Sequence, residues 1–195
     1  MPSDRSPTSP LTFTVTFDGP VKVTSGHAGA GGVDSTVDRT IAVPATSLKG
    51  VIRDAADQLV GHASAGQALL DATFGSPRTP SAWAWSDLAV DEDLTTAPVP
   101  RTRVRLNDTT GTVVTGALLV AEEHWIRRGT VTLTALRPTT APQRALLLLA
   151  AATVDALGSD RRRGSGWTSW ACADEHTAEL AAATSLLTRH LESTP

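Results

Sequence analysis

The order of apolar and polar residues along the chain predicts several strands. Between Leu11 and Phe17, apolar residues alternate with threonines, and this period of two is typical of a strand with one buried face. The alternation returns at residues 131–135. Shorter pieces of strand are expected within residues 82–90, 102–106 and 167–172.

Two longer segments have the spacing of amphipathic helices. The first begins where Thr46 or Ser47 can act as the N-cap and continues to Val60, with apolar residues three and four positions apart. The second begins near Pro142, which suits a first helical turn, and runs to Gly158, which suits a left-handed C-terminal cap.

The order strand, helix, strands, helix, strand predicts an α+β fold with a ferredoxin-like (RRM-like) core. We expect residues 1–10, rich in proline and serine, to be a disordered lead-in, and residues 11–195 to form a single domain. Residues 86–118 are expected to form an insertion that projects from the core. Residues 174–192 are expected to form a C-terminal helix that packs on the outside or on a neighbouring subunit.

Composition narrows the class of protein. Apolar residues make up 41% of the chain, enough for a hydrophobic core, and the single cysteine, Cys172, allows neither an internal disulfide nor a thiolate zinc site. No apolar run is long enough to span a membrane and the N-terminus lacks the features of a signal peptide, so we expect a cytoplasmic protein. The formal net charge of -3 argues against a free-standing nucleic-acid-binding protein, unless the basic residues gather on one face.

Lys49 and Arg53 lie four residues apart in the first predicted helix, so their side chains project from the same side. The helix N-terminus beside them offers unpaired N–H groups and a partial positive charge, which suit a phosphate. The alternative interpretation is a solvated pair of side chains on a surface helix.

The loop after the second predicted helix concentrates positive charge. Arg161, Arg162 and Arg163 are followed by Gly164 and Gly166, so guanidinium groups and backbone amides are offered together, as in phosphate-binding sites. The alternative interpretation is a solvated surface loop.

A glycine-rich loop between the first strand and the first helix carries titratable side chains. Asp34 is followed four residues later by Asp38, and a carboxylate in such a loop can orient a ribose hydroxyl, act as a general base or hold a divalent cation. The alternative is an aspartate that only caps a turn. His27, in the same loop, can donate a hydrogen bond to a phosphate or transfer a proton.

Two other groups of residues are expected to have structural roles. Glu122, Glu123 and His124 are expected at a strand end, and because no paired cysteines or second histidine lie at ligand spacing, we expect no structural metal site. Four tryptophans can be core anchors or base-stacking platforms, and the core is favoured; they are Trp83, Trp85, Trp167 and Trp170.

Four segments together resemble the RAMP superfamily, whose name stands for repeat-associated mysterious protein. Within it they are most similar to the backbone subunits of type III CRISPR effector complexes. The S-L-K-G-x-x-R element, residues 47–53, is the most specific of the shared features. The four segments are HAGAGGVDSTVDR at residues 27–39, VPATSLKGVIRDAADQL at residues 43–59, Phe74-Gly75, and GSDRRRGSGW at residues 158–167.

The resemblance implies a ferredoxin-like RNA-binding domain that stacks with further copies or other RAMP subunits along a guide RNA. Residues 86–118 would be an inserted thumb that interrupts the duplex between guide and complementary target RNA. The large and small effector-complex subunits would be further partners of this ribonucleoprotein, which serves antiviral defence. Lys49 and Arg53 would hold the guide backbone, His27 would lie near it, and the loop from Arg161 to Gly166 would face the RNA.

In catalytic members of the family, an aspartate in the loop before S-L-K-G cleaves target RNA with a divalent metal, and Asp34 lies at the matching place. The resemblance therefore implies an endoribonuclease that uses Mg²⁺ or Mn²⁺. Asp34 is preferred to Asp38 because D-S-x-V-x-R matches the family's pattern from Asp34. Two alternatives stay open: a non-catalytic scaffold or cap subunit of such a complex, and a guide-RNA-processing endonuclease with His27 as acid or base.

Overall fold

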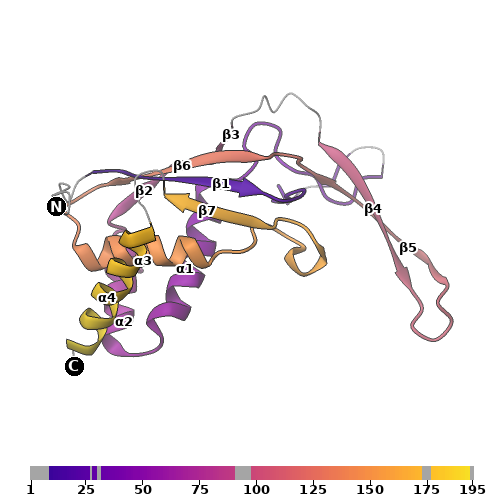
Figure 1. Cartoon of the computed structure of the whole chain (residues 1–195). Helices are drawn as coiled ribbons and strands as arrows, with labels where there is room; N and C mark the ends of the chain where they lie inside the picture. Colours follow the sequence, from indigo (N-terminus) through magenta and orange to yellow (C-terminus); the bar gives the residue numbers. More distant parts are fainter. Residues whose placement is uncertain (1–8, 27, 30–31, 91–97, 173–176, 194–195) are drawn as a thin grey trace.

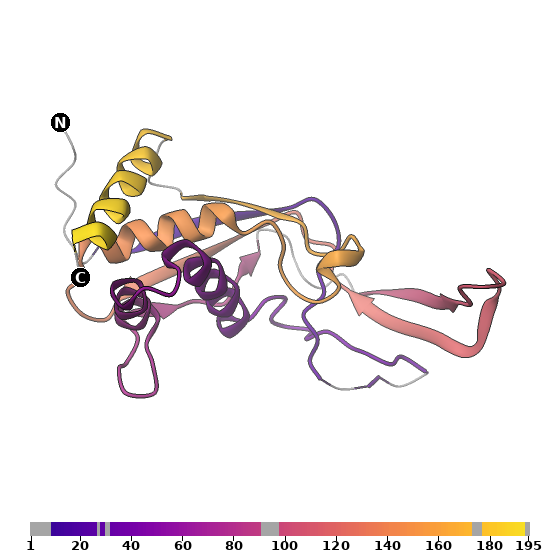
Figure 2. The same ribbon diagram turned by 90° about the horizontal axis from the view of Figure 1, so that it is seen from below.

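The structure, a computed structural model, describes residues 9–26, 28–29, 32–90, 98–172 and 177–193. It confirms the expected mixture of helices and strands, arranged as a main sheet, a helical layer and a projecting hairpin (Figures 1 and 2). In chain order the elements are β1 (Leu11–Phe17), α1 (Ala45–Val60), α2 (Ser64–Phe74), β2 (Trp83–Trp85), β3 (Ala89–Val90), β4 (Val99–Leu106), β5 (Val113–Glu123), β6 (Arg128–Ala135), α3 (Ala141–Thr153), the 3-10 turn η1 (Arg161–Arg163), β7 (Thr168–Cys172) and α4 (Thr177–Ser193).

The main sheet is built around the first strand. β1 runs antiparallel to β6 on one side and to β7 on the other, and the order across the sheet is β2-β6-β1-β7, with β3 also paired to β6. Every second residue of β1 is buried and the threonines between them are half-buried, so the predicted period of two is confirmed. The strands that flank β1 therefore both come from the later part of the chain.

The helices lie on one face of the main sheet, as Figure 1 shows. From α1, Leu48, Ile52 and Ala56 point into the core, and none of them has exposed surface. α3 adds Leu146 and Leu147, which are also fully buried, and α4 packs against α3. Among the described residues, no helix combines the length and the apolar character needed to cross a membrane.

β4 and β5 form a separate two-stranded sheet that projects from one end of the core (Figures 1 and 2). Val104 pairs with Leu118 and, beyond a shift in register, Leu106 pairs with Val113, so the hairpin carries two cross-strand pairs of apolar, half-exposed side chains. The insertion expected at residues 86–118 covers β3 and most of this hairpin. Because β3 pairs with β6 in the main sheet, the projecting part begins only at β4.

The helix expected to end at Gly158 is shorter in the structure. α3 ends at Thr153, and the residues after it leave the helix to run beside the segment that precedes β7. The N–H of Leu157 donates to the carbonyl of Gly166 at 2.7 Å. Strand-like pairing therefore replaces the last helical turn. This pairing depends on a contact between distant segments, which the local spacing of apolar residues cannot predict.

Residues 64–74 are given no element by the sequence patterns described above, yet α2 occupies them and buries Leu69, Leu70 and Phe74 in the core. The helix expected at residues 174–192 corresponds to α4, although residues 173–176 lie outside the described part of the chain, as do residues 1–8 of the expected lead-in. α2 thus adds a second helix before the first return to the main sheet.

The packing of α1 predicts a contrast between two leucines. Leu48 has 0% of its surface exposed and Leu59, on the same helix, has 38% exposed. Leu48→Ala should lower the free energy of unfolding by about 2–5 kcal/mol, because it leaves a cavity in the core. Leu59→Ala should lower it by less than about 1 kcal/mol. Urea unfolding measures both, and equal losses would contradict the orientation of α1.

Candidate nucleic-acid interface

The start of α1 and the loop after α3 line one cavity of about 500 Å³. Ser47, Gly50 and Asp54 face it from α1, and Gly158 and Arg161 face it from the loop. These segments are far apart in the sequence, and a polynucleotide held by both requires that they meet. The structure brings them together.

Lys49 and Arg53 are not part of the lining of this cavity. The guanidinium of Arg53 instead forms an ion pair with Asp71 of α2, with Nη2 and Oδ1 3.7 Å apart and both side chains nearly half exposed. Burial, and secondly the charge of Arg53, hold the pKa of Lys49 below its ordinary value. The two basic side chains are therefore a second positive site, on another side of α1.

The N-terminus of α1 has an acceptor from its own chain. Pro44 occupies the N-cap position, rather than Thr46 or Ser47. The N–H of Ala45 donates to the carboxylate of Asp87 at 2.7 Å. A negative group at a helix N-terminus is stabilised by the helix dipole, so Asp87 already occupies part of the place where the sequence predicts a phosphate.

The basic turn η1 combines positive charge with an exposed aromatic ring. Arg161 and Arg162 line a second cavity, of about 320 Å³, together with Trp167. Trp167 has 58% of its surface exposed, so the prediction that it is a core anchor is wrong, whereas Trp83, with 2% exposed, is buried as predicted. Exposed guanidinium groups beside an indole suit the phosphates and bases of a single strand.

Asp160 holds the basic turn to the base of the hairpin. Its carboxylate lies 2.5 Å from Nη1 of Arg103 on β4 and 3.5 Å from Nζ of Lys22, which is buried. Burial opposes ionisation of Asp160, but the hydrogen bond and charge of Arg103, joined by Lys22, outweigh it and keep the pKa of Asp160 below its ordinary value. The turn is therefore anchored by ionic contacts to segments before and inside the hairpin.

Glu123, at the end of β5, forms the second anchor. Its side chain has 2% exposure and accepts hydrogen bonds from Arg101 at 3.3 Å, Arg103 at 3.1 Å and the hydroxyl of Ser165 at 3.2 Å. Ser165 is fully buried in the loop that follows η1. Buried carboxylates are stable only when paired in this way, so Glu123 fixes the loop against the hairpin.

Gly164 and Gly166, in the loop that follows η1, have different structural roles. A side chain on Gly166 would collide with the carbonyl of Leu157, and the N–H of Gly166 donates to the carbonyl of Pro20 at 2.7 Å. Gly166 therefore serves close backbone packing, and its amide is not free for a phosphate. Gly164 is exposed, has a φ of 83° and would have open space around a side chain, so its backbone remains accessible.

Asp34 lies against the hairpin. Its N–H donates to the carbonyl of Val120 at 2.8 Å, and its Oδ2 accepts the N–H of Val120 at 2.8 Å. The adjacent Ser35 bridges to Ala121 in parallel with β5. Asp34 is exposed, and no described residue bonds its other carboxylate oxygen, Oδ1.

Asp38 caps a turn. Its Oδ1 accepts the N–H of Thr40 at 2.7 Å, the N–H of Ile41 at 2.8 Å and the hydroxyl of Thr40 at 2.8 Å. These bonds, that from the Thr40 amide first, lower the pKa of Asp38 to about 2. Each aspartate thus keeps one carboxylate oxygen that no described residue bonds, Oδ1 of Asp34 and Oδ2 of Asp38, but only Asp38 caps a turn of its own loop.

The other titratable groups of this region are paired or undescribed. His27 lies outside the described residues, so its predicted role is not placed. Glu122 accepts a hydrogen bond from Arg39 at 2.6 Å, and His124 bonds through Nε2 to the carbonyl of Asp38 at 2.8 Å. Within the described ranges, no three His, Cys, Asp or Glu side chains are grouped to hold a metal ion.

Sequence reasoning misses the arginines at the base of the hairpin. Arg101 and Arg103 share a face of β4, and their spacing of two is visible in the sequence. Their partners, Glu123 and Asp160, lie in other parts of the chain. Only the fold could show that these arginines bind carboxylates rather than phosphates.

Comparison with known proteins gives a family and a fold. Residues 16–169 match the sequence family described as RAMPs, the RAMP superfamily. A chain of the type III-B Cmr-beta apo structure, determined by cryo-EM, is similar with a TM-score of 0.64 at 12% identity, covering 85% of this chain and 98% of that chain. A chain of the cryo-EM structure of type III-B Cmr-beta bound to cognate target RNA is similar with a TM-score of 0.62 at 11% identity. The match covers 84% of this chain and 97% of that chain. No curated protein matches the sequence.

Substitutions of Gly164 and Gly166 form a matched pair that tests the close packing at Gly166. Gly164 and Gly166 both have positive φ, at 83° and 76°, so alanine strains the backbone at either position. Only Gly166→Ala also collides with Leu157. Gly164→Ala should cost about 1 kcal/mol of unfolding free energy and Gly166→Ala roughly 3 kcal/mol or more, by urea unfolding. Equal costs would contradict the close packing at Gly166.

Proposed function

The chain belongs to the RAMP superfamily, and from that premise we propose that it binds single-stranded guide RNA as a backbone subunit of a type III CRISPR effector complex. One observation carries the proposal: the start of α1 and the loop that holds η1 line the same cavity. The likeness to chains of type III-B Cmr-beta structures, one of them bound to cognate target RNA, supports the choice of complex.

The main sheet is proposed to be a ferredoxin-like core. The order β2-β6-β1-β7 and the placement of α1 and α3 on one face support this assignment. In such a core, the first strand is central and the two crossover helices lie together. The loops that leave β1 and α3 then emerge at the same end, where the cavity lies.

The chemistry of the loop after α3 favours a polynucleotide ligand. Arg161 and Arg162 supply guanidinium groups for phosphates, and Trp167 supplies a flat apolar surface for a base. A single-stranded RNA presents these two kinds of group in alternation. Lys49 and Arg53 form the second positive site, on α1, and this site suits a further phosphate.

The projecting hairpin is assigned as the thumb of the subunit. Its two exposed apolar pairs, Val104 with Leu118 and Leu106 with Val113, suit contact with bases of a guide–target duplex or with a neighbouring subunit. Copies of this chain, other RAMP subunits and the large and small subunits of the complex are the proposed protein partners.

Target cleavage is proposed to depend on Asp34. Its carboxylate would take the proton of a ribose 2'-hydroxyl as the 2'-oxygen attacks the adjacent phosphorus. The bond from phosphorus to the 5'-oxygen then breaks, the 5'-oxygen takes a proton from water, and a cyclic phosphate remains. Asp34 and the RNA phosphate together would hold a divalent cation, Mg²⁺ or Mn²⁺, which would neutralise charge at the phosphate.

A non-catalytic scaffold is the second candidate. Asp34 already accepts the backbone N–H of Val120 through Oδ2, and this contact alone explains why an aspartate lies there. In that case the chain holds guide RNA and target RNA without cutting either.

The proposed interface predicts that removing positive charge weakens RNA binding only when the charge is removed from the interface. Arg161→Ala with Arg162→Ala should weaken binding to single-stranded RNA and reduce the slope of log affinity against log salt by about 0.7 for each phosphate that is no longer neutralised. Arg78→Ala with Arg189→Ala removes the same charge from exposed positions outside the interface and serves as the control. Fluorescence anisotropy over a salt series measures both. An equal weakening in the control pair would contradict the proposed interface.

Cleavage predicts that Asp34→Asn abolishes activity without disturbing the loop. Asparagine keeps an oxygen that accepts the N–H of Val120 but cannot take a proton, so target cleavage by the assembled complex should fall about 100-fold or more. RNA binding should be unchanged. Target shortening on a gel in Mg²⁺ or Mn²⁺ is the measurement. Unaltered cleavage by the variant would reject Asp34, and no cleavage by the wild-type complex would favour the scaffold.

A further inference from the structure

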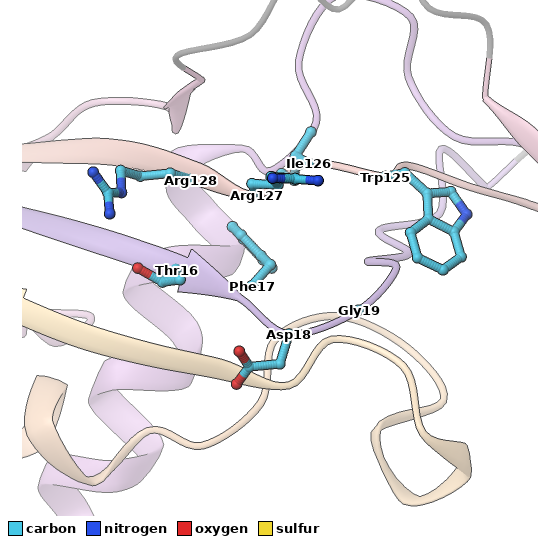
Figure 3. A pocket seen from close by; sticks show the side chains of 8 residues that line it. All are labelled: Thr16, Phe17, Asp18, Gly19, Trp125, Ile126, Arg127 and Arg128. Atoms are coloured by element: carbon cyan, nitrogen blue, oxygen red, sulfur yellow. The ribbon is translucent and has the colours of Figure 1, made fainter.

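A larger cavity lies between the end of β1 and the start of β6, beside the base of the hairpin (Figure 3). Its volume is about 760 Å³, within the range of sites that bind small molecules. It shares no lining residue with the two cavities described above, which Arg161 lines. Its lining includes Phe17, Asp18, Trp125, Ile126, Arg127 and Arg128.

The lining has an apolar base and an aromatic wall. Phe17 and Ile126 have 6% and 4% of their surface exposed, so they belong to the core and close the cavity from below. Trp125 has 63% exposed and stands at one end of the lining in Figure 3. An indole exposed to this extent is not explained by core packing.

The charged groups of the cavity are also exposed. Arg127 and Arg128 come from the β6 side of the cavity, and Asp18 lies on the β1 side, as Figure 3 shows. The backbone beneath them is fixed, because the N–H of Phe17 donates to the carbonyl of Arg127 at 2.8 Å. None of the ion pairs of the described residues uses Arg127 or Arg128, so both guanidinium groups are open to a ligand.

We propose that this cavity holds one nucleotide of a single-stranded RNA, with its base stacked on Trp125 and its phosphate on Arg127 and Arg128. Asp18 accepts a hydrogen bond from an amino group of the base or from the ribose hydroxyl. A nucleotide has the flat ring, the anion and the donors that these side chains require. The inference rests on the proposed RNA-binding function and adds a stacking site to it.

The second exposed tryptophan supports the assignment. Trp167 lies with Arg161 and Arg162 in the other cavity, so an indole beside two arginines occurs twice. The two places are neighbours, because the N–H of Asp18 donates to the carbonyl of Trp167 at 3.0 Å. A single strand that leaves one site therefore reaches the other within a short length of chain.

The test measures binding of the full chain to a short single-stranded RNA and to a set in which one base at a time is removed. Trp125→Ala should weaken binding about 5- to 100-fold, and Trp125→Phe should keep most of the affinity, because phenylalanine also stacks. Removing the base at one position should weaken the wild type and leave Trp125→Ala unaffected. The exposed position of Trp125 predicts an unfolding midpoint close to that of the wild type.

Three other outcomes overturn the inference. Affinity unchanged in Trp125→Ala, with Arg161→Ala and Arg162→Ala still harmful, rejects the stacking site and leaves the proposed function standing. RNA affinity unchanged with loss of association with another subunit makes the cavity a protein-docking site. No binding of RNA by the wild type rejects the proposed function and the stacking site together.

Discussion

Arg103 lies between two carboxylates, and this arrangement fixes the surface on which the proposed function depends. It donates to Glu123 at the end of β5 and pairs with Asp160 just before η1. Since Glu123 is almost fully buried, an unpaired charge there would strongly destabilise the fold. The hairpin base and the basic turn are therefore bound to each other, and Arg161 and Arg162 can stay exposed at a defined place beside α1.

This arrangement also reconciles an acidic chain with a basic interface. The net charge of -3 describes the whole molecule, whereas a ligand meets only local charge. Several acidic side chains near the interface are already bonded to cations of the chain, as Glu122 is to Arg39 and Asp160 is to Lys22. Arg161, Arg162, Arg127 and Arg128 are exposed and line cavities beside tryptophans. The positive groups are thus concentrated beside the two exposed tryptophans.

The elements with strong periodicity could be predicted from the sequence. The alternation in β1 and the three-four spacing in α1 report burial on one face, and both elements occur where expected. The end of α3 could not be predicted, because Leu157 pairs with Gly166 across the loop. Likewise, the glycine at 166 suggests a phosphate site in the sequence, but its amide bonds to Pro20. Contacts between segments distant in the sequence determine both of these features. The exposure of Trp167 is a third feature that the sequence pattern does not show.

The proposed function requires that the loop after α3 and the start of α1 touch one RNA strand. Photo-cross-linking with a guide RNA that carries 4-thiouridine, followed by mass spectrometry of the attached peptides, tests this requirement directly. We expect cross-links within residues 158–167, with others near residues 47–54. Cross-links confined to α2 and α4, with none in the loop after α3, would contradict the proposed function.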